Sequence, residues 1–333
     1  MNEALQQRIK AYPGSLTYLD LIRRNRRDST LIMAGMILLG VLLGGVIAAA
    51  LGAYGGQAAD QLLPSILLGA GAALVAGSLG AVWSWFGGAG AILAMSGARQ
   101  IEKSQDPELF NVVEEVAIAA GLPMPRVFLI QESAMNAFAT GRDPGHAAVA
   151  ITTGLRERLT RDELQGVMAH EMSHVRHYDI RFGMLMATMV GLIVFACDAA
   201  RRVVFHGGRS GRRISKDKGS GAAIVLIVVA LILAVIAPFI ARFMQMAYSR
   251  RREYLADAGA VELSRNPEGL ASALGKLAGD TEPLVEAANR GTAHLFIVNP
   301  LRMMRESHQS LDTIFSSHPP IQERIARLMA LAR

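Results

Sequence analysis

The sequence contains His170-Glu171-Met172-Ser173-His174, an HExxH motif whose two histidines are four residues apart. Residues at this spacing lie on one face of a helix, so both imidazoles can bind the same metal ion. Glu171 lies beside the first histidine, where it can deprotonate a water molecule bound to zinc. Zinc lowers the pKa of such a water towards about 7 and makes hydroxide available to attack a peptide carbonyl. The motif therefore predicts a zinc hydrolase with one Zn²⁺ per chain.

An HExxH pattern also arises by chance on helices, so its context and a third ligand are decisive. Thr160 and Glu163 are three residues apart at the expected start of this helix, which is the spacing of a capping box. Val167, Met168 and Met172 give the helix apolar residues to bury. The context therefore favours a folded helix that carries the motif.

The segment before this helix is expected to be soluble and to mix helix with strand. Helical periodicity runs from Pro107 to Ala120 and ends at Gly121. Short strands are expected at 126–130, 136–140 and 147–153, the last two joined by a turn that contains glycine and proline. The fold class expected for the chain is mainly α, with a small β-sheet.

A catalytic zinc site usually has three protein ligands and one open position. The metzincin pattern requires a third histidine six residues after the second, with a glycine midway, but Ile180 and His177 occupy these positions. Glu253 and Asp257 are four residues apart and could share a helical face. Glu253 could then bind zinc while Asp257 orients a ligand histidine. The plain alternative is a solvated helix whose acids lie near arginines.

The composition indicates a membrane protein. Hydrophobic residues make up 51% of the chain, charged residues 19%, and the mean hydropathy is +0.30. Four apolar runs are candidate transmembrane helices. They are Leu31 to Tyr54, Gln61 to Ala98, Gly183 to Ala200 and Gly221 to Ala241. The second run could hold one span at about 63–86 or two short spans that turn near Gly87-Gly88, and one span is preferred because two would barely fit.

The positive charges orient the membrane part. The basic N-terminus and the basic segment from Arg99 onward are expected in the cytoplasm, and the linker 55–61, which lacks Lys and Arg, outside. The basic loop 201–218 conflicts with four complete spans, so a hairpin that dips into the membrane is the alternative to our four-span interpretation. Either version gives an even number of crossings between HEMSH and Glu253, which places both on one side.

Several motifs together resemble the HtpX family of integral-membrane zinc metalloproteases, which is related to the CAAX prenyl proteases. The resemblance covers about residues 30–333 and includes the two apolar runs between HEMSH and Glu253. Its motifs are Asn136 to Gly141, HEMSH followed by Asp179, Ser249-Arg250 followed by Glu253 and Asp257, and His318-Pro319-Pro320 followed by Glu323-Arg324. This combination in this order is specific, whereas each short piece alone is weak.

The resemblance implies a zincin-like α+β protease domain in a helical membrane protein. It implies zinc ligands at His170, His174 and Glu253, with Asp257 in support. Asp179 would be a second acid behind the ligands, the alternative being an ordinary residue at a helix end.

The resemblance also implies how substrate is held. Asn136, Ala137 and Phe138 would belong to an edge strand that binds an extended substrate through its backbone. His318 and Arg324 would approach the zinc and stabilise the oxyanion. The alternative for His318 is a histidine that starts a C-terminal helix after a turn.

These observations together predict a membrane-bound zinc endopeptidase of the plasma (inner) membrane with its catalytic domain in the cytoplasm. The resemblance implies polypeptide substrates, in particular misfolded membrane proteins, and a part in quality control. Nucleic acid is excluded as a partner because the basic clusters flank apolar runs. A zinc-stabilised scaffold or chaperone without turnover is the alternative function. The oligomeric state stays open.

The expected domain organisation follows the apolar runs. A basic cytoplasmic tail precedes two transmembrane helices, and a transmembrane hairpin separates the two parts of the protease domain. The boundaries are 1–30 for the tail, 31–98 for the first two spans, 99–180 for the first part, 181–241 for the hairpin and 242–333 for the second part.

Overall fold

The computed structural model describes the chain except for the residues 1–17, 58–60, 207–219, 281–296, 298–318 and 333. The chain divides into two compact units. We call the first the sheet unit and the second the helix unit. The sheet unit consists of Met1–Ser29, Trp85–Met184 and Met246–Arg333, and the helix unit of Thr30–Ser84 and Leu185–Gln245.

The sheet unit contains a four-stranded mixed sheet in the order β1-β2-β4-β3. β2 and β4 are parallel, while β1 pairs antiparallel with β2 and β3 antiparallel with β4. The strands are β1 (Arg99–Gln100), β2 (Arg126–Ile130), β3 (Ala137–Thr140) and β4 (Ala148–Thr152). β3 is therefore an edge strand, and it begins one residue later than the sequence indicates.

Both faces of this sheet are buried, which explains why β2 and β4 are almost continuously apolar. Val127 and Val149 lie in the larger apolar core, together with residues of the covering helices. Phe128 and Phe138 belong to a second cluster with Ile92, Met184 and other residues at the end of α3 and the start of α7. The sheet is thus fixed from both sides within this unit.

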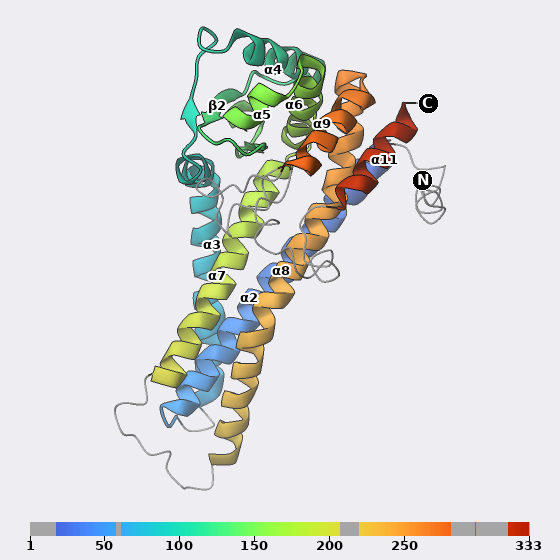
Figure 1. Ribbon diagram of the computed structural model, residues 1–333. Helices are drawn as coiled ribbons and strands as arrows, with labels where there is room; N and C mark the ends of the chain where they lie inside the picture. The colour runs from blue at the N-terminus through green and yellow to red at the C-terminus, as the bar shows by residue number, and fades with distance from the viewer. Residues whose placement is uncertain (1–17, 58–60, 207–219, 281–296, 298–318, 333) are drawn as a thin grey trace. The chain divides into compact units, whose positions relative to one another are not determined.

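Helices cover the larger core and interlock with one another (Figure 1). α6 contacts α4, α9 and β3, and α9 also contacts α11. These helices are α4 (Pro107–Ala120), α5 (Thr153–Arg158), α6 (Arg161–Arg176), α9 (Pro267–Gly279) and α11 (Ile321–Leu331). The bounds of α4 agree with the sequence because Asp106 caps its first turn and Gly121 ends it at φ 66°, a conformation that favours glycine.

The capping box expected at the start of α6 is present. The Thr160 side chain accepts a hydrogen bond from the Glu163 backbone, and the Glu163 carboxylate accepts one from the Thr160 backbone. The same carboxylate also accepts hydrogen bonds from Ser272 and Lys276 of α9, each at 2.6 Å. The helix that carries HEMSH is therefore fixed at its first turn to a second helix.

Long helices cross between the units. They are α2 (Tyr18–Tyr54), α3 (Leu62–Met95), α7 (Asp179–His206) and α8 (Ser220–Ser264). Within the described residues, four helices are long and apolar enough to span a membrane, over Thr30–Tyr54, Leu62–Met95, Asp179–Val203 and Ile224–Met246. α3 continues without a turn through residues 87–88, as the one-span interpretation expects. Most of the basic loop 201–218 lies outside the described residues.

Small residues set the packing of α2 against α3 in the helix unit. A Cβ added to Gly69 would meet the carbonyl oxygen of Gly44 at 2.4 Å and the Cβ of Ala48 at 2.3 Å. Such close backbone contact is typical of transmembrane helices, where small residues form the interface. By contrast, Leu67 and Leu68 are exposed, as expected for side chains that face lipid.

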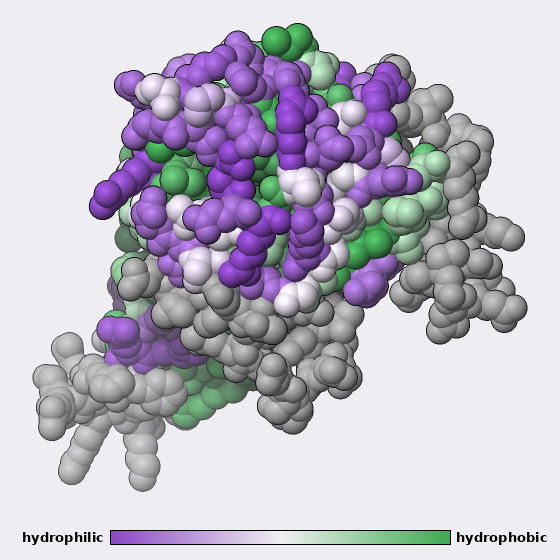
Figure 2. Space-filling view, turned by 45° about the horizontal axis from the view of Figure 1, so that its top comes forward, coloured by the Kyte–Doolittle hydropathy of each residue, from purple (hydrophilic) through white to green (hydrophobic). Residues whose placement is uncertain are grey.

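Figure 2 shows a face of the molecule that is more polar than the exposed leucines of α3. Hydrophilic residues cover most of its coloured area, and hydrophobic residues form small patches between them. Together the two units confirm a mainly helical membrane protein with a small mixed sheet.

Candidate metal centre

α6 brings the HEMSH side chains into the interior of the sheet unit. His170 and Glu171 are 1% and 2% exposed. The rings of His170 and His174 lie edge to face, with centroids 4.8 Å apart. The helical spacing of four residues therefore does place both imidazoles together, as the sequence predicts.

Glu253 of α8 completes a group of three possible ligands. Its Oε2 lies 3.6 Å from Nε2 of His170, and its Oε1 lies 3.7 Å from Nε2 of His174. One ligand atom from each of the three residues lies within 4.8 Å of the others. Tetrahedral zinc with bonds of about 2.0–2.2 Å needs donors roughly 3.3–3.6 Å apart. The two distances from Glu253 to the imidazoles are close to this range, and a donor set of two imidazoles and a carboxylate fits the chemistry of zinc.

An acid holds the far side of each imidazole. Nδ1 of His170 is 3.0 Å from Asp257, and Nδ1 of His174 is 3.0 Å from Asp179. A carboxylate at Nδ1 favours the tautomer that carries its proton there and leaves the Nε2 lone pair for a metal. The structure thus brings Asp257 and Asp179 next to the two histidines, and their supporting roles stay a prediction.

Two buried arginines form ion pairs with these acids. Arg252 contacts Asp179 Oδ1 at 2.8 Å and donates to its backbone carbonyl at 2.9 Å. Arg324 of α11 donates to both oxygens of Asp257 at 2.9 and 2.8 Å, and its Nη1 lies 3.1 Å from Glu253 Oε2. Arg324 thus lies at the centre, as expected, but its guanidinium contacts acids of α8. This geometry favours a positioning role over that of an oxyanion donor.

The buried charges shift the pKa values of these groups. Burial would lower the pKa of His170, but hydrogen bonds with Asp257 and Glu253 outweigh it and raise the pKa to about 9 in the metal-free site. Burial raises the pKa of Glu171. Burial would also raise the pKa of Asp257, yet the charge of Arg324 outweighs it and lowers the pKa of this acid.

The edge strand β3 lies against Glu171. A hydrogen bond with the backbone of Ala139 lowers the pKa of Glu171 and opposes part of the effect of burial. Asn136 is buried, and its Oδ1 accepts the backbone N–H of Ala137. The Phe138 side chain is fully buried in the second cluster. Phe138 therefore has no exposed side chain on this edge, and the binding of substrate by residues 136–138 stays a prediction.

His318 lies outside the described residues, so its role stays a prediction. Arg252 was not singled out as a site residue, because it is one of three consecutive arginines and only the helix register shows which of them faces Asp179.

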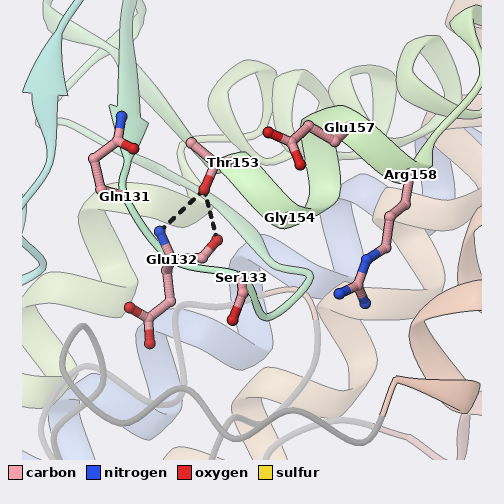
Figure 3. Close-up of a pocket in the computed structure, with 7 residues that line it drawn as sticks. All are labelled: Gln131, Glu132, Ser133, Thr153, Gly154, Glu157 and Arg158. Atoms are coloured by element: carbon pink, nitrogen blue, oxygen red, sulfur yellow. Dashed lines mark hydrogen bonds between the residues drawn. The ribbon is translucent and has the colours of Figure 1, made fainter.

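A separate polar cavity of about 540 Å³ lies where β2 leads into the loop before β3 (Figure 3). The Thr153 side chain joins its two walls, since Oγ1 accepts the Glu132 N–H at 3.1 Å and donates to the Glu132 carbonyl at 2.8 Å. A Cβ at Gly154 would lie 1.8 Å from the Ser133 carbonyl oxygen, so the walls tolerate only glycine there. The cavity shares no residue with the metal centre.

Comparisons with known proteins identify a family and several similar proteins. The model of peptidase family M48 matches residues 103–332. The Protease HtpX homolog of Ligilactobacillus salivarius is 40% identical over 92% of this chain and 97% of its own length. That of Dictyoglomus turgidum is 47% identical over 71% of this chain and 73% of its own. The crystal structure of S. mikatae Ste24p aligns with a TM-score of 0.46 and 20% identity, over 74% of this chain and 55% of that one, about half its length.

Proposed function

The chain belongs to peptidase family M48, and from that membership we propose that it is a membrane-bound zinc endopeptidase with ligands His170, His174 and Glu253. That it is a metalloprotease and a membrane protein follows from its family, its relatives and its apolar helices. The observation that carries the proposal is the convergence of two Nε2 atoms and one carboxylate, with both Nδ1 atoms held by acids.

Each residue of the centre has a defined task in hydrolysis. Zinc, when bound, supplies a Lewis acid that polarises the peptide carbonyl and makes water acidic. Glu171 takes the proton from that water and delivers it to the leaving amine. Its hydrogen bond with the Ala139 backbone fixes the direction of its carboxylate. Asp257 and Asp179 hold the two imidazoles in the tautomer that this chemistry needs.

The edge strand defines the kind of substrate. Pairing with the backbone of β3 requires an extended chain and reads little of its side-chain sequence. Folded proteins rarely present such a segment, whereas misfolded ones do. We therefore assign the enzyme to quality control of membrane proteins, acting at the lipid bilayer in which it resides.

The charge pattern supports the location. Basic residues precede the first span and follow the second, which fits a plasma (inner) membrane protein with its catalytic domain in the cytoplasm. In this assignment 1–30 is a cytoplasmic tail, 31–98 and 181–241 are the membrane segments, and 99–180 and 242–333 form the protease domain.

Replacing Glu171 with Gln tests the base role, because Gln keeps the shape but cannot accept a proton. We expect full zinc content and a fall in kcat of roughly 10²- to 10⁴-fold on an unfolded model protein. Glu114→Gln, an exposed change on α4, is the control and should cleave like wild type.

Two outcomes would count against the proposal. Cleavage by Glu171→Gln at the wild-type rate would exclude Glu171 as the base. A wild-type enzyme that binds zinc stoichiometrically and never cleaves would favour the scaffold alternative instead.

A further inference from the structure

The outer edge of β3 already carries partners from this chain. Asn136 accepts the backbone N–H of Thr152 at 3.0 Å, so it faces β4. Alternate residues of an antiparallel strand face opposite sides, and Met135, Ala137 and Ala139 therefore direct their backbone groups to the open edge. The Ala137 carbonyl accepts the N–H of Ile297 at 2.9 Å. This is the hydrogen bond that an added strand would make.

The side-chain carboxylate of Asp280 occupies the preceding outward-facing position of this edge, at Met135. Oδ2 of Asp280 accepts the Met135 N–H at 2.6 Å, and its Oδ1 pairs with Arg158 at 3.1 Å. At the other end, Ala139 makes a backbone hydrogen bond with Glu171. Ile297 thus sits between a capped end of the edge and the residue beside the metal centre.

The carbonyl of Ile297 reaches the metal centre from the other side. It accepts a hydrogen bond from Nη1 of Arg324 at 3.3 Å, and the same nitrogen lies 3.1 Å from the ligand carboxylate of Glu253. The Ile297 side chain is 2% exposed and belongs to the larger apolar core, together with Ala137 and Val167. Its N–H, its carbonyl and its side chain are therefore each held by a separate part of the site.

We propose that Ile297 occupies a substrate subsite, as an internal residue in the position of a bound peptide. The proposal rests on the proposed function, because a substrate that pairs with β3 needs the Ala137 carbonyl that Ile297 now uses. The place of its side chain defines the subsite as one for bulky aliphatic residues. Substrate and Ile297 compete for the same groups, so the enzyme restrains its own activity.

The expected size of this restraint follows from one hydrogen bond. A backbone hydrogen bond contributes about 1 kcal/mol. If only a fraction f of the enzyme has the β3 edge free to bind peptide, the apparent dissociation constant for peptide is larger by a factor of 1/f. Freeing the Ala137 carbonyl should therefore tighten peptide binding roughly fivefold. Peptides with Ile, Leu or Val at the residue that pairs with Ala137 should bind better than matched peptides with Asp.

The test uses the full chain in detergent and the variant Ile297→Pro, which removes the N–H donor. We expect KM for an unstructured aliphatic peptide to fall about fivefold at unchanged zinc content. Ile101→Pro is the matched control. Its residue is also buried in the larger core, and its N–H bonds to the Val127 carbonyl at 3.0 Å on the far side of the sheet. That variant should lose stability without any fall in KM.

A binding experiment separates this proposal from the proposed function. The affinity of a labelled aliphatic peptide is measured for Glu171→Gln with and without Ile297→Pro, which requires no turnover. Tighter binding in the double variant supports the subsite even if wild type never cleaves. Equal binding in both, with an active wild type, overturns the subsite and leaves the peptidase assignment standing.

If Ile297→Pro does not fold, Ile297→Gly tests the same proposal. This variant keeps the backbone N–H and empties the position of the side chain. Added aliphatic peptide should raise the thermal midpoint of this variant more than that of wild type. An equal rise in both would overturn the proposal, as would a fall in kcat/KM of Ile297→Pro at full zinc content.

Discussion

At the scale of single residues, the centre consists of two parallel series of side-chain contacts. One runs from His170 through Asp257 to Arg324, the other from His174 through Asp179 to Arg252. In each series a buried arginine pairs with an acid, and the acid contacts an imidazole. Asp257 and Asp179 thus each have a cationic partner, which offsets part of the cost of burying them.

Replacing Asp257 with Asn tests the first series of contacts, from His170 to Arg324. The amide keeps the shape but loses the charge that orients Nδ1 of His170, so we expect zinc affinity to fall about 10- to 100-fold. The measurement is a zinc dissociation constant obtained by competition with a chelator. Asp162→Asn, an exposed change on α6, should leave affinity unchanged. Equal affinities for wild type and Asp257→Asn would show that His170 needs no such support.

Helical spacing in the sequence is enough to bring some of these residues together, whereas Asp179 and Arg324 are expected only from the family resemblance. HEMSH fixes His170 and His174 by helical spacing, and the four-residue step between Glu253 and Asp257 puts both acids on one face. Nothing local connects Arg324 or Ile297 to these residues, because they meet only through tertiary packing. Contacts between residues so distant in the chain depend on the complete fold.

At the scale of elements, α6 depends on its first turn. Burial would raise the pKa of Glu163, but hydrogen bonds from Lys276, Ser272 and Thr160 outweigh it and hold the pKa at about 2. The folded pKa lies below the unfolded value near 4.5, so this group stabilises the fold above that pH. The contribution is lost as the pH falls from about 5 towards 2.

Glu163→Gln should therefore lower the free energy of unfolding by about 2 kcal/mol at pH 7 and flatten the acid limb of the stability curve. The measurement is the thermal midpoint between pH 7 and pH 3. Asp162→Asn in the same turn serves as the control, since Asp162 is exposed. Parallel pH curves for Glu163→Gln and wild type would contradict the role of this carboxylate.

The contact of α2 with α3 permits a prediction with its control on the same helix. Gly69→Leu places atoms against the Gly44 backbone and should destabilise the helix unit by about 1–3 kcal/mol. Gly71→Leu meets nothing within 4 Å and should be tolerated. Thermal unfolding in one detergent compares them, and equal midpoints would show that the two helices pack differently.

The elements themselves were predictable where local signals are strong. α4, β2 and the start of α6 agree with the sequence because caps, glycine and apolar periodicity all mark the same boundaries. β4 begins and ends one residue inside the expected range, since Thr153 opens α5 instead of extending the strand. The two-residue strand β1 has no such signal and exists only through pairing with β2.

At the scale of the whole molecule, the number of membrane crossings decides whether the site can form. A single cysteine is placed at Gly56 or at Ser210 in a chain that carries Cys197→Ala, and labelling is compared from the two sides. Four complete spans predict that both positions react with an impermeant reagent added outside. A cysteine at Ser264 should react only from the cytoplasmic side. Reaction of position 210 from the cytoplasmic side alone would show a re-entrant hairpin instead.

The proposed metal ligands come from α6 and α8, with α7 between them in the chain. During translation His170 and His174 are therefore synthesised first. Glu253 follows only after both apolar runs of the hairpin have been made. Arg324, which holds the acids of α8, follows later still. A nascent chain cannot assemble the complete centre before the hairpin has been synthesised. The order of translation thus delays assembly of the centre until the second pair of membrane-spanning helices has been made.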